Sequence, residues 1–175
     1  MKIFSNCECE TTIIKFFIKL FGFECEGVEK AQCCGKLVDG DVTVYHMPSI
    51  IRYIGQKAKC QCYFGREITQ KAQVDSWLER AEAMCNVLDQ IEFYCSEKGT
   101  SFYHNGFIKG LFERAIGSFD CMEKYLSMNT FLVNDRISIA DFYMVYVLKY
   151  YIALIAKADA AKYQNVTRYM NTIAE

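Results

Sequence analysis

The stretch "NDRISIADFYM", residues 134–144, constrains the fold more than any other part of the chain, because a helix-start signal stands directly before an apolar run. Ser138 and Asp141 give the pattern Ser-x-x-Asp, which is the signature of a capping box. In that arrangement Ser138 accepts from the N–H of the third helical residue, and Asp141 accepts from the N–H of Ser138. Arg136 could suggest a catalytic group, but the spacing favours a structural role. We therefore predict a helix from residue 139, with Ser138 and Asp141 as its structural N-cap.

The predicted helix is apolar on nearly all sides. Its longest apolar run, "FYMVYVLKYYIALIA", occupies residues 142–156 and is interrupted by Lys149. A helix that crosses a bilayer needs about 20 predominantly apolar residues, so this run is too short to span one. A helix without a polar face is typical of the centre of a packed bundle. We expect it to be a buried core helix.

Helical periodicity continues on both sides of this core helix. Apolar residues recur at helical spacing over residues 69–95 and 107–126. The stretch "AAKYQNVTRYMNTIAE" adds a last helix, which is entered through a polar turn at Gln164-Asn165. The C-terminal part of the chain therefore reads as an all-α bundle.

The first third of the chain has a different pattern. "MKIF" is a short strand candidate, and residues 11–23 carry apolar side chains at helical spacing. "GKLVDGDVTVYH" is typical of a β-hairpin with Asp39-Gly40 as its turn. "PSIIRYIGQK" opens with Pro48, and proline suits the first position of a helix. Strand, helix, hairpin and helix make a small α/β unit, and a linker, "AKCQCYFGREIT", follows it.

Composition excludes some classes of function. The chain has 175 residues, 52% of them apolar, and a formal net charge of −1. Binding to nucleic acid relies on neutralising phosphates with Lys and Arg, so we expect no direct tRNA binding. The N-terminus, "MKIFSNCECE", lacks a signal-peptide layout because charged and polar residues interrupt it, and we expect a cytoplasmic chain.

Cysteine is abundant, with ten residues, but no CxxC pair occurs. In a reducing compartment these side chains stay thiols, and the spacing is not that of a zinc site. We expect no metal and no cofactor, although a redox or metal role for the clusters stays open. The clusters are Cys7-x-Cys9, Cys33-Cys34 and Cys60-x-Cys62.

The order of elements, together with four motifs, resembles the glutathione-transferase-like superfamily. The motifs are "LVDGDVTVYHMPSIIRYIG", "QVDSWLERAEA", "FLVNDRISIADFYMVYVLKYY" and "KYQNVTRYMNTIAE". The resemblance implies a GST-like fold: a reduced, degenerate thioredoxin-like α/β N-terminal domain over 1–58 and an all-α C-terminal helical bundle over 67–175. The chain looks most like the GST-like modules of the translation apparatus. These are the appended domains of methionyl- and glutamyl-tRNA synthetases, the small auxiliary protein of the multi-synthetase complex, and the gamma subunit of the elongation-factor complex.

The same resemblance defines three places where active relatives hold glutathione. A Tyr, Ser or Cys after the first strand activates the thiol, a cis-proline precedes the third strand, and a Glu/Gln-Ser pair begins the next helix. The corresponding positions hold Ser5, Cys7 and Cys9 after the strand, Gly35 or Lys36 in place of the proline, and His46 and Met47 in place of the pair.

Two of these three places depart from the pattern of active relatives. Pro48 is the only proline of the chain, and methionine cannot hydrogen-bond a carboxylate as serine does. The segment between Phe23 and Gly35 is also short for the strand and helix that active relatives place there. We therefore predict no catalytic activity; if the chain is an enzyme, it is a glutathione-dependent transferase or thiol reductase that uses Ser5, Cys7 or Cys9.

The main prediction is a scaffold for protein–protein interaction in protein biosynthesis. Its partners would be GST-like domains of aminoacyl-tRNA synthetases or translation factors, or a second copy in a homodimer. One implied surface combines the helix after the hairpin with the first bundle helix, and the other centres on the last helix. The candidates are Ser49, Arg52, Tyr53, Gln56, Lys71, Asp75 and Leu78 on the first surface, and Arg168, Tyr169 and Asp159 on the second. For Arg168 an ordinary helix charge, or an internal ion pair with Asp159 or Asp141, stays open.

Overall fold

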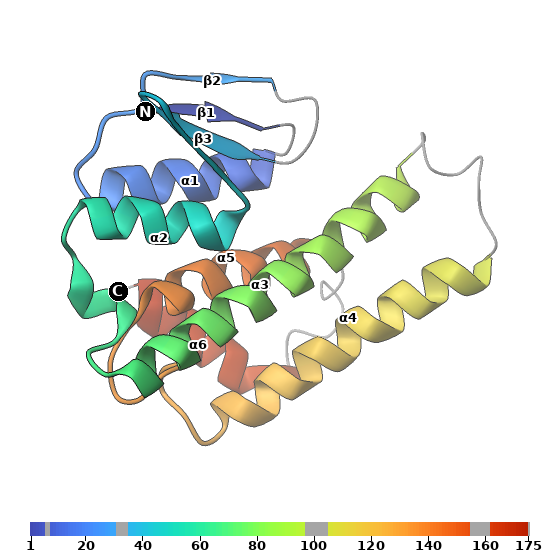
Figure 1. Ribbon diagram of the computed structural model, residues 1–175. Helices are drawn as coiled ribbons and strands as arrows, with labels where there is room; N and C mark the ends of the chain where they lie inside the picture. Colours follow the sequence, from blue (N-terminus) through green and yellow to red (C-terminus); the bar gives the residue numbers. More distant parts are fainter. Residues whose placement is uncertain (6–7, 31–34, 97–104, 155–161, 175) are drawn as a thin grey trace. The chain divides into compact units, whose positions relative to one another are not determined.

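The computed structural model describes residues 1–5, 8–30, 35–96, 105–154 and 162–174 (Figure 1). The chain divides into two compact units, Met1–Lys71 and Ala72–Glu175, and each unit is described by itself. None of the helices in the described ranges is long and apolar enough to cross a membrane.

The first unit contains a four-stranded sheet with the strand order β2-β1-β3-β4. Its strands are β1 (Lys2–Phe4), β2 (Gly27–Glu29), β3 (Lys36–Asp39) and β4 (Val42–Tyr45). β1 pairs in parallel with β2 and antiparallel with β3, which in turn pairs antiparallel with β4. β1 and the hairpin confirm the sequence prediction, whereas β2 was not predicted.

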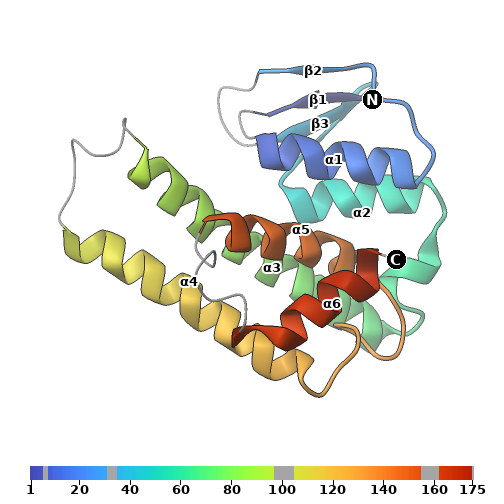
Figure 2. The same ribbon diagram turned by 180° about the vertical axis from the view of Figure 1, so that it is seen from behind.

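Two helices cover one face of this sheet, α1 (Glu8–Leu20) and α2 (Met47–Lys57) (Figures 1 and 2). Ile3 and Leu37 are partners across β1 and β3, and both are fully buried. α1 and α2 pack against each other and against the sheet with apolar side chains at helical spacing. These buried side chains are Ile13, Ile14, Phe17 and Ile18 of α1, and Ile50, Ile51 and Ile54 of α2.

The hairpin turn lies one residue later than the sequence predicted. Asp39 pairs with Val42, so it belongs to β3, and the two-residue loop is Gly40-Asp41. Gly40 has φ of 61°, whereas Asp41 is not among the residues with positive φ. A two-residue hairpin loop with a positive φ at its first position alone is a type II′ turn, which selects glycine there. The Asp-Gly dipeptide identified the hairpin correctly, but the prediction of Asp39-Gly40 as the turn is wrong.

The predicted linker is folded onto the first unit. Its residues Gln61–Phe64 form the 3₁₀ helix η1, and the ring of Tyr63 lies 6.2 Å from that of Phe21. The ring of Phe64 lies so close to Gly55 that a Cβ at Gly55 would overlap it. A glycine in the middle of α2 is therefore required by this packing.

The second unit is a helical bundle. Its helices are α3 (Ile68–Cys95, from Ala72 onward in this unit), α4 (Asn105–Leu126), α5 (Ile139–Leu154) and α6 (Gln164–Ala174). α5 supplies the largest share of fully buried side chains, which confirms the prediction of a core helix. They include Ile139, Ala140, Tyr143, Met144, Val147, Leu148 and Tyr151.

Candidate functional site

The ends of three strands meet at one edge of the sheet. Phe4, the last residue of β1, pairs with Lys36, the first residue of β3, and Lys36 pairs with Tyr45, the last residue of β4. The next residue at each of these strand ends is therefore Ser5, Gly35 or His46. Strand register thus brings Ser5, Gly35 and His46 to one edge of the sheet, although they are far apart in the sequence. These are the three places at which the resemblance puts glutathione binding.

Ser5 is held from two sides at this edge. Its N–H donates to the Glu29 carbonyl oxygen at 3.1 Å, which continues the β1–β2 pairing by one residue. Its hydroxyl donates to Oε2 of Glu10 at 2.9 Å. Ser5 is 7% exposed, so the hydroxyl has a defined direction in a largely buried setting.

Glu10 lies in the first turn of α1 and was not singled out by the sequence analysis. Its carboxylate also lies against Gly35, where a Cβ would stand 2.6 Å from Oε2 and 3.2 Å from Cδ. Real Cβ atoms do not approach that closely, so the absence of a side chain at Gly35 makes room for the carboxylate. The spacing from Ser5 to Glu10, across a strand end and a first helical turn, was the signal available in the sequence.

His46 and Met47 do not reproduce the Glu/Gln-Ser pair of active relatives. His46 is exposed and has φ of 63°, in the left-handed region, which is uncommon for residues other than glycine. Met47 is 2% exposed, and its side chain offers no hydrogen-bond donor. No side chain caps α2, so the donors available there are backbone N–H groups of its first turn and the exposed hydroxyl of Ser49.

A positive charge lies at the same edge. Lys36 Nζ stands 4.6 Å from the ring centroid of Phe4, an arrangement that allows a cation–π contact. The described residues contain no cis peptide bond, and the residues that directly precede Gly35 lie outside the described ranges.

The cysteines contribute little to the described part of this site. Cys7, Cys33 and Cys34 lie outside the described residues, and Cys9 is described only through the backbone of α1. The cysteines with described side chains are free thiols, namely Cys25, Cys60, Cys62, Cys85, Cys95 and Cys121. Within the described ranges, no group of three or more His, Cys, Asp or Glu side chains could hold a metal ion.

The first predicted partner surface is divided between the two units. Ser49 is exposed and Arg52 is half-buried, while the Tyr53 hydroxyl donates to Asp39 Oδ2 at 2.7 Å. Lys57 forms an ion pair with the same carboxylate. Hydrogen bonds from Lys57 and Tyr53 hold the pKa of Asp39 below its usual value. The hydrogen bond with Asp39 raises the pKa of Tyr53. In the second unit, Asp75 is half-buried and Leu78 is fully buried; Gln56 and Lys71 of the first unit are exposed.

Arg168 of the second predicted surface contacts the end of another helix. Its Nη2 donates to the carbonyl oxygens of Leu126 at 2.6 Å and Asn129 at 3.4 Å. Leu126 is the last residue of α4, so Arg168 satisfies an acceptor that the helix end leaves open. Tyr169 is fully buried and is not part of an exposed surface. Asp159 lies outside the described residues.

The capping residues at the start of α5 form a dense hydrogen-bond cluster. Asp141 Oδ2 accepts from both the N–H and the hydroxyl of Ser138 at 2.7 Å. Asp141 Oδ1 accepts from the Leu132 N–H at 2.9 Å and from the Tyr169 hydroxyl at 2.9 Å. Burial and the charge of Asp141 raise the pKa of Tyr169 well above its ordinary value. Asp141 thus has the predicted acceptor role of a capping box. The prediction that the Ser138 side chain accepts from the third helical residue is wrong: the Asp141 N–H donates to the Ser138 carbonyl oxygen at 3.2 Å, and the Ser138 hydroxyl donates to Asp141.

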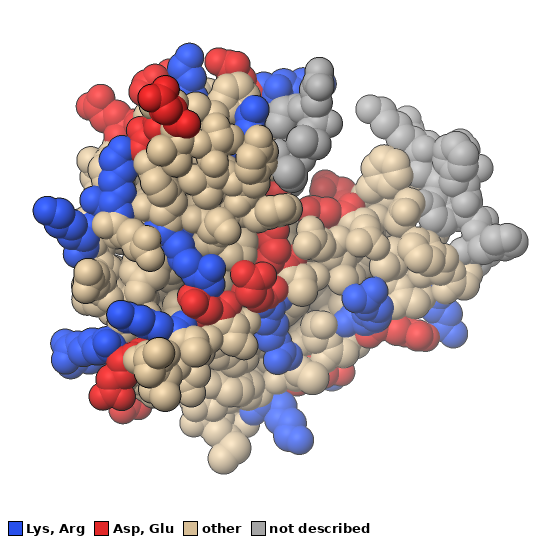
Figure 3. Space-filling view, viewed as in Figure 1, with Lys and Arg blue, Asp and Glu red and all other residues tan. Residues whose placement is uncertain are grey.

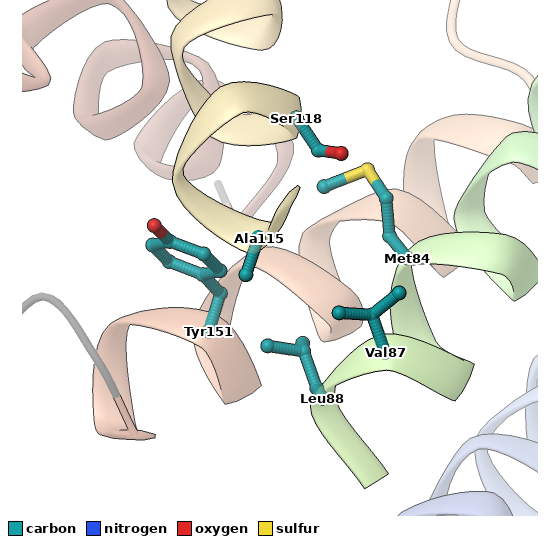
Figure 4. Close-up of a pocket in the computed structure, with 6 residues that line it drawn as sticks. All are labelled: Met84, Val87, Leu88, Ala115, Ser118 and Tyr151. Carbon is teal, nitrogen blue, oxygen red and sulfur yellow. The ribbon is translucent and has the colours of Figure 1, made fainter. Parts of the chain in front are cut away.

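Ser5 does not line either of two hollows found among the described residues. A cavity of about 10 Å³ within the second unit is lined by side chains of α3, α4 and α5 (Figure 4). A cavity needs about 10–15 Å³ to hold a single water, so this one is a packing gap rather than a ligand site. In the first unit, an open groove of about 470 Å³ lies beside Lys15, Phe23 and Gly27. Gly27 pairs with Lys2, so the groove is at the end of β1 opposite to Ser5.

Charged side chains on the face shown in Figure 3 are mixed in sign. Lys and Arg stand among Asp and Glu there, without a broad area of one sign over the described residues. This distribution matches the formal net charge of −1.

Comparison with known proteins identifies the class of fold. Residues 109–175 match the family described as glutathione S-transferase, C-terminal domain. Poplar glutathione transferase F1 has a TM-score of 0.78 at 16% identity, with 99% of this chain and 92% of that chain covered. Ure2p5 from Phanerochaete chrysosporium, cocrystallized with 1-(S-glutathionyl)-2,4-dinitrobenzene, has a TM-score of 0.84 at 16% identity, with 98% and 87% covered. The chain therefore has the glutathione-transferase fold.

A curated relative agrees with this class. Glutathione S-transferase F9 of Arabidopsis thaliana is 28% identical over 134 residues, a match that covers 72% of this chain and 61% of the relative. The chain thus spans less than two thirds of that protein's length. The resemblance to the glutathione-transferase-like superfamily is confirmed for the fold and for the C-terminal domain.

The prediction of a translation scaffold is wrong. The curated relative and the poplar structure named above are glutathione transferases, and neither is named as a module of the translation apparatus. The error has a physical origin. The missing proline and serine side chains favoured a non-catalytic chain, whereas strand register brings the backbone of all three places together regardless of those side chains.

Proposed function

We propose that this chain is a glutathione-dependent transferase that joins the glutathione sulfur to an electrophilic substrate at Ser5. The observation that carries the proposal is the shared sheet edge, where Ser5, Gly35 and His46 are neighbours through the register of β1, β3 and β4. The name of the curated relative, glutathione S-transferase F9, supports the same reaction class.

The reaction assigns a definite task to Ser5. The thiol loses its proton to solvent or to a base, the sulfur forms a bond to an electrophilic carbon, and a leaving group departs with the electron pair of its bond. A hydroxyl that donates to the sulfur stabilises the thiolate and fixes its position. The Ser5 hydroxyl donates to Glu10 in this structure, so it must turn from the carboxylate to the sulfur when it acts as that donor.

The rest of the peptide would be held mainly by backbone groups. Gly35, directly before β3, offers peptide N–H and C=O groups beside Ser5, as a strand edge does for an extended peptide. The γ-glutamyl carboxylate would meet the first turn of α2, where backbone N–H groups and the helix dipole favour an anion. Because Met47 is buried and lacks a donor, we expect weaker glutathione binding than a serine there would give.

The test is an assay of turnover with glutathione and 1-chloro-2,4-dinitrobenzene. This electrophile is chosen because its glutathione conjugate is the compound cocrystallized with the Phanerochaete relative. Ser5→Ala should lower kcat by about 100-fold, the typical cost of removing one donor to a developing or bound anion. Ser76→Ala removes an exposed hydroxyl in α3, away from the first turn of α2, and serves as the matched control.

Binding is measured separately by thermal unfolding with S-methylglutathione. A ligand that binds only the folded chain stabilises it by RT ln(1 + [L]/Kd), which is about 1.4 kcal/mol at tenfold excess over Kd. If the wild-type chain shows neither turnover nor stabilisation by this ligand, the proposed function is wrong.

A further inference from the structure

We propose that Glu10 keeps a glutathione thiol bound at Ser5 in its protonated form at neutral pH. This inference rests on the proposed function, because it concerns the ligand of the same site. Glu10 would be a positioning residue, since it acts on the thiol through the Ser5 hydroxyl and through its own charge.

The direction of the Ser5 hydroxyl is the first reason. Its O–H points to Glu10 Oε2 at 2.9 Å, and a hydroxyl has one proton to donate and two lone pairs that accept. While the proton is given to the carboxylate, Ser5 presents an acceptor to any neighbouring group. An S–H can donate to that oxygen, whereas a thiolate has nothing to donate. The hydroxyl orientation therefore favours the thiol over the thiolate.

The charge of the carboxylate is the second reason. A sulfur in contact with Ser5 Oγ lies within roughly 6 Å of Oε2, given the 2.9 Å between the two oxygens. A like charge at about 4–6 Å disfavours the ionised form of a neighbouring group. Both effects have the same sign, so they add.

Packing holds the carboxylate in this place. It lies over Gly35, where an added Cβ would stand 2.6 Å from Oε2. The carboxylate thus occupies a space that exists because residue 35 has no side chain. A methyl group at that position would push the flexible end of Glu10 aside.

Other charged or titratable groups at this end of the sheet are few among the described residues. Lys36 Nζ stands over the Phe4 ring, and the Glu29 carboxylate lies 3.9 Å from Lys2 Nζ. Lys30 follows β2, and His46 follows β4. These groups are unchanged in a Glu10 variant. A difference between the wild-type chain and that variant therefore reports Glu10 itself.

The experiment titrates the thiol of bound glutathione by the ultraviolet absorbance of the thiolate, in the full chain. Glu10→Gln keeps the size of the side chain and removes its charge. We expect it to lower the apparent pKa of the bound thiol by about one unit, the lower end of the effect of a close charge. Turnover one pH unit below the wild-type pKa should then rise by several-fold, and the two rates should converge at high pH. Glu29→Gln is the matched control and should leave the thiol pKa unchanged.

Gly35→Ala is a second way to move the Glu10 charge away from the bound thiol. It displaces the Glu10 carboxylate from Ser5 without removing the charge from the chain, so a smaller fall in the thiol pKa is expected. Binding of S-methylglutathione, which has no thiol proton, is measured for each variant. If that ligand binds and the wild type turns over, but Glu10→Gln leaves the thiol pKa unchanged, the inference is overturned and the proposed function stands. If neither glutathione nor S-methylglutathione binds the wild type, both fail together.

Discussion

Each unit of this chain contains a carboxylate in the first turn of a helix, and the two carboxylates are used in opposite ways. Asp141 in the second unit is fully buried and accepts four hydrogen bonds. Glu10 in the first unit is half-buried and accepts from one donor among the described residues, the Ser5 hydroxyl. A carboxylate whose lone pairs are all engaged can only hold structure together. One with spare acceptor capacity beside a hydroxyl can take part in chemistry.

The largest expected effect comes from breaking the saturated cluster. Asp141→Ala leaves the Leu132 N–H, the Ser138 groups and the Tyr169 hydroxyl without their acceptor. Each buried donor that loses its partner costs about 1–3 kcal/mol, so we expect a loss of about 3–5 kcal/mol in the free energy of unfolding. Urea unfolding followed by circular dichroism measures it, with Ser138→Ala as a milder companion at about 1 kcal/mol. A loss below 1 kcal/mol for Asp141→Ala would contradict the structural role.

Removing one donor of the same cluster should have a smaller effect. Tyr169→Phe deletes the hydroxyl that donates to Asp141 at 2.9 Å, and a typical net cost is about 1–1.5 kcal/mol. The pKa of Tyr169 is raised by burial first and by Asp141 second. Its contribution is therefore complete below the pKa of an unfolded tyrosine, about 10, and is lost as the pH rises above it. Alkaline unfolding curves should be flatter for Tyr169→Phe than for the wild type; equal slopes would contradict this assignment.

Variants of Arg168 test whether the contacts of this side chain with the end of α4 stabilise the bundle. Arg168→Ala removes the hydrogen bonds to the carbonyl oxygens of Leu126 and Asn129. Since the side chain is largely exposed, we expect a loss of only about 0.5–1 kcal/mol in the free energy of unfolding. Thermal melts of Arg168→Ala and Arg168→Lys measure it. A melting temperature that stays at the wild-type value in both would show that these contacts contribute nothing to stability.

The smallest effect on stability is expected for Glu10. Glu10→Gln keeps a hydrogen-bond acceptor near Ser5 and removes a charge that the described structure does not pair. We expect the free energy of unfolding to change by no more than about 0.5 kcal/mol, as for most surface substitutions. Urea unfolding next to Asp141→Asn makes the comparison direct. A loss as large as that of the Asp141 variant would place Glu10 among the structural carboxylates.

Periodicity and turn chemistry predicted most of the fold. The core helix from residue 139, the helix after Pro48 and the Asp-Gly hairpin each carry a strong local signal. β2 was missed because Gly27–Glu29 is only three residues long and sits at the edge of the sheet. Val28 is 42% exposed there, so no alternation of apolar and polar residues marks the strand.

The candidate site was harder to predict, because its contacts depend on register rather than on residue type. Ser5 was recognised as a candidate hydroxyl from the sequence. Its contact with Glu10 depends on how the chain turns between β1 and α1, and the contact of Glu10 with Gly35 depends on the pairing of β1 with β3. The contacts of Arg168 could not be predicted for the same reason. Its acceptors lie about forty residues earlier, at and just after the end of α4, so no local pattern revealed them and Arg168 was assigned to a partner surface.

The packing of η1 on α2 has a practical consequence for dissecting the chain. A fragment that stopped at residue 58 would lose Tyr63 and Phe64, and would uncover the Phe21 ring and the flat surface at Gly55 that those rings cover. Newly bared aromatic surface promotes self-association. Limited proteolysis should therefore spare the segment 61–64 in the intact chain. A soluble N-terminal fragment is best ended after Phe64, near the Lys71–Ala72 boundary.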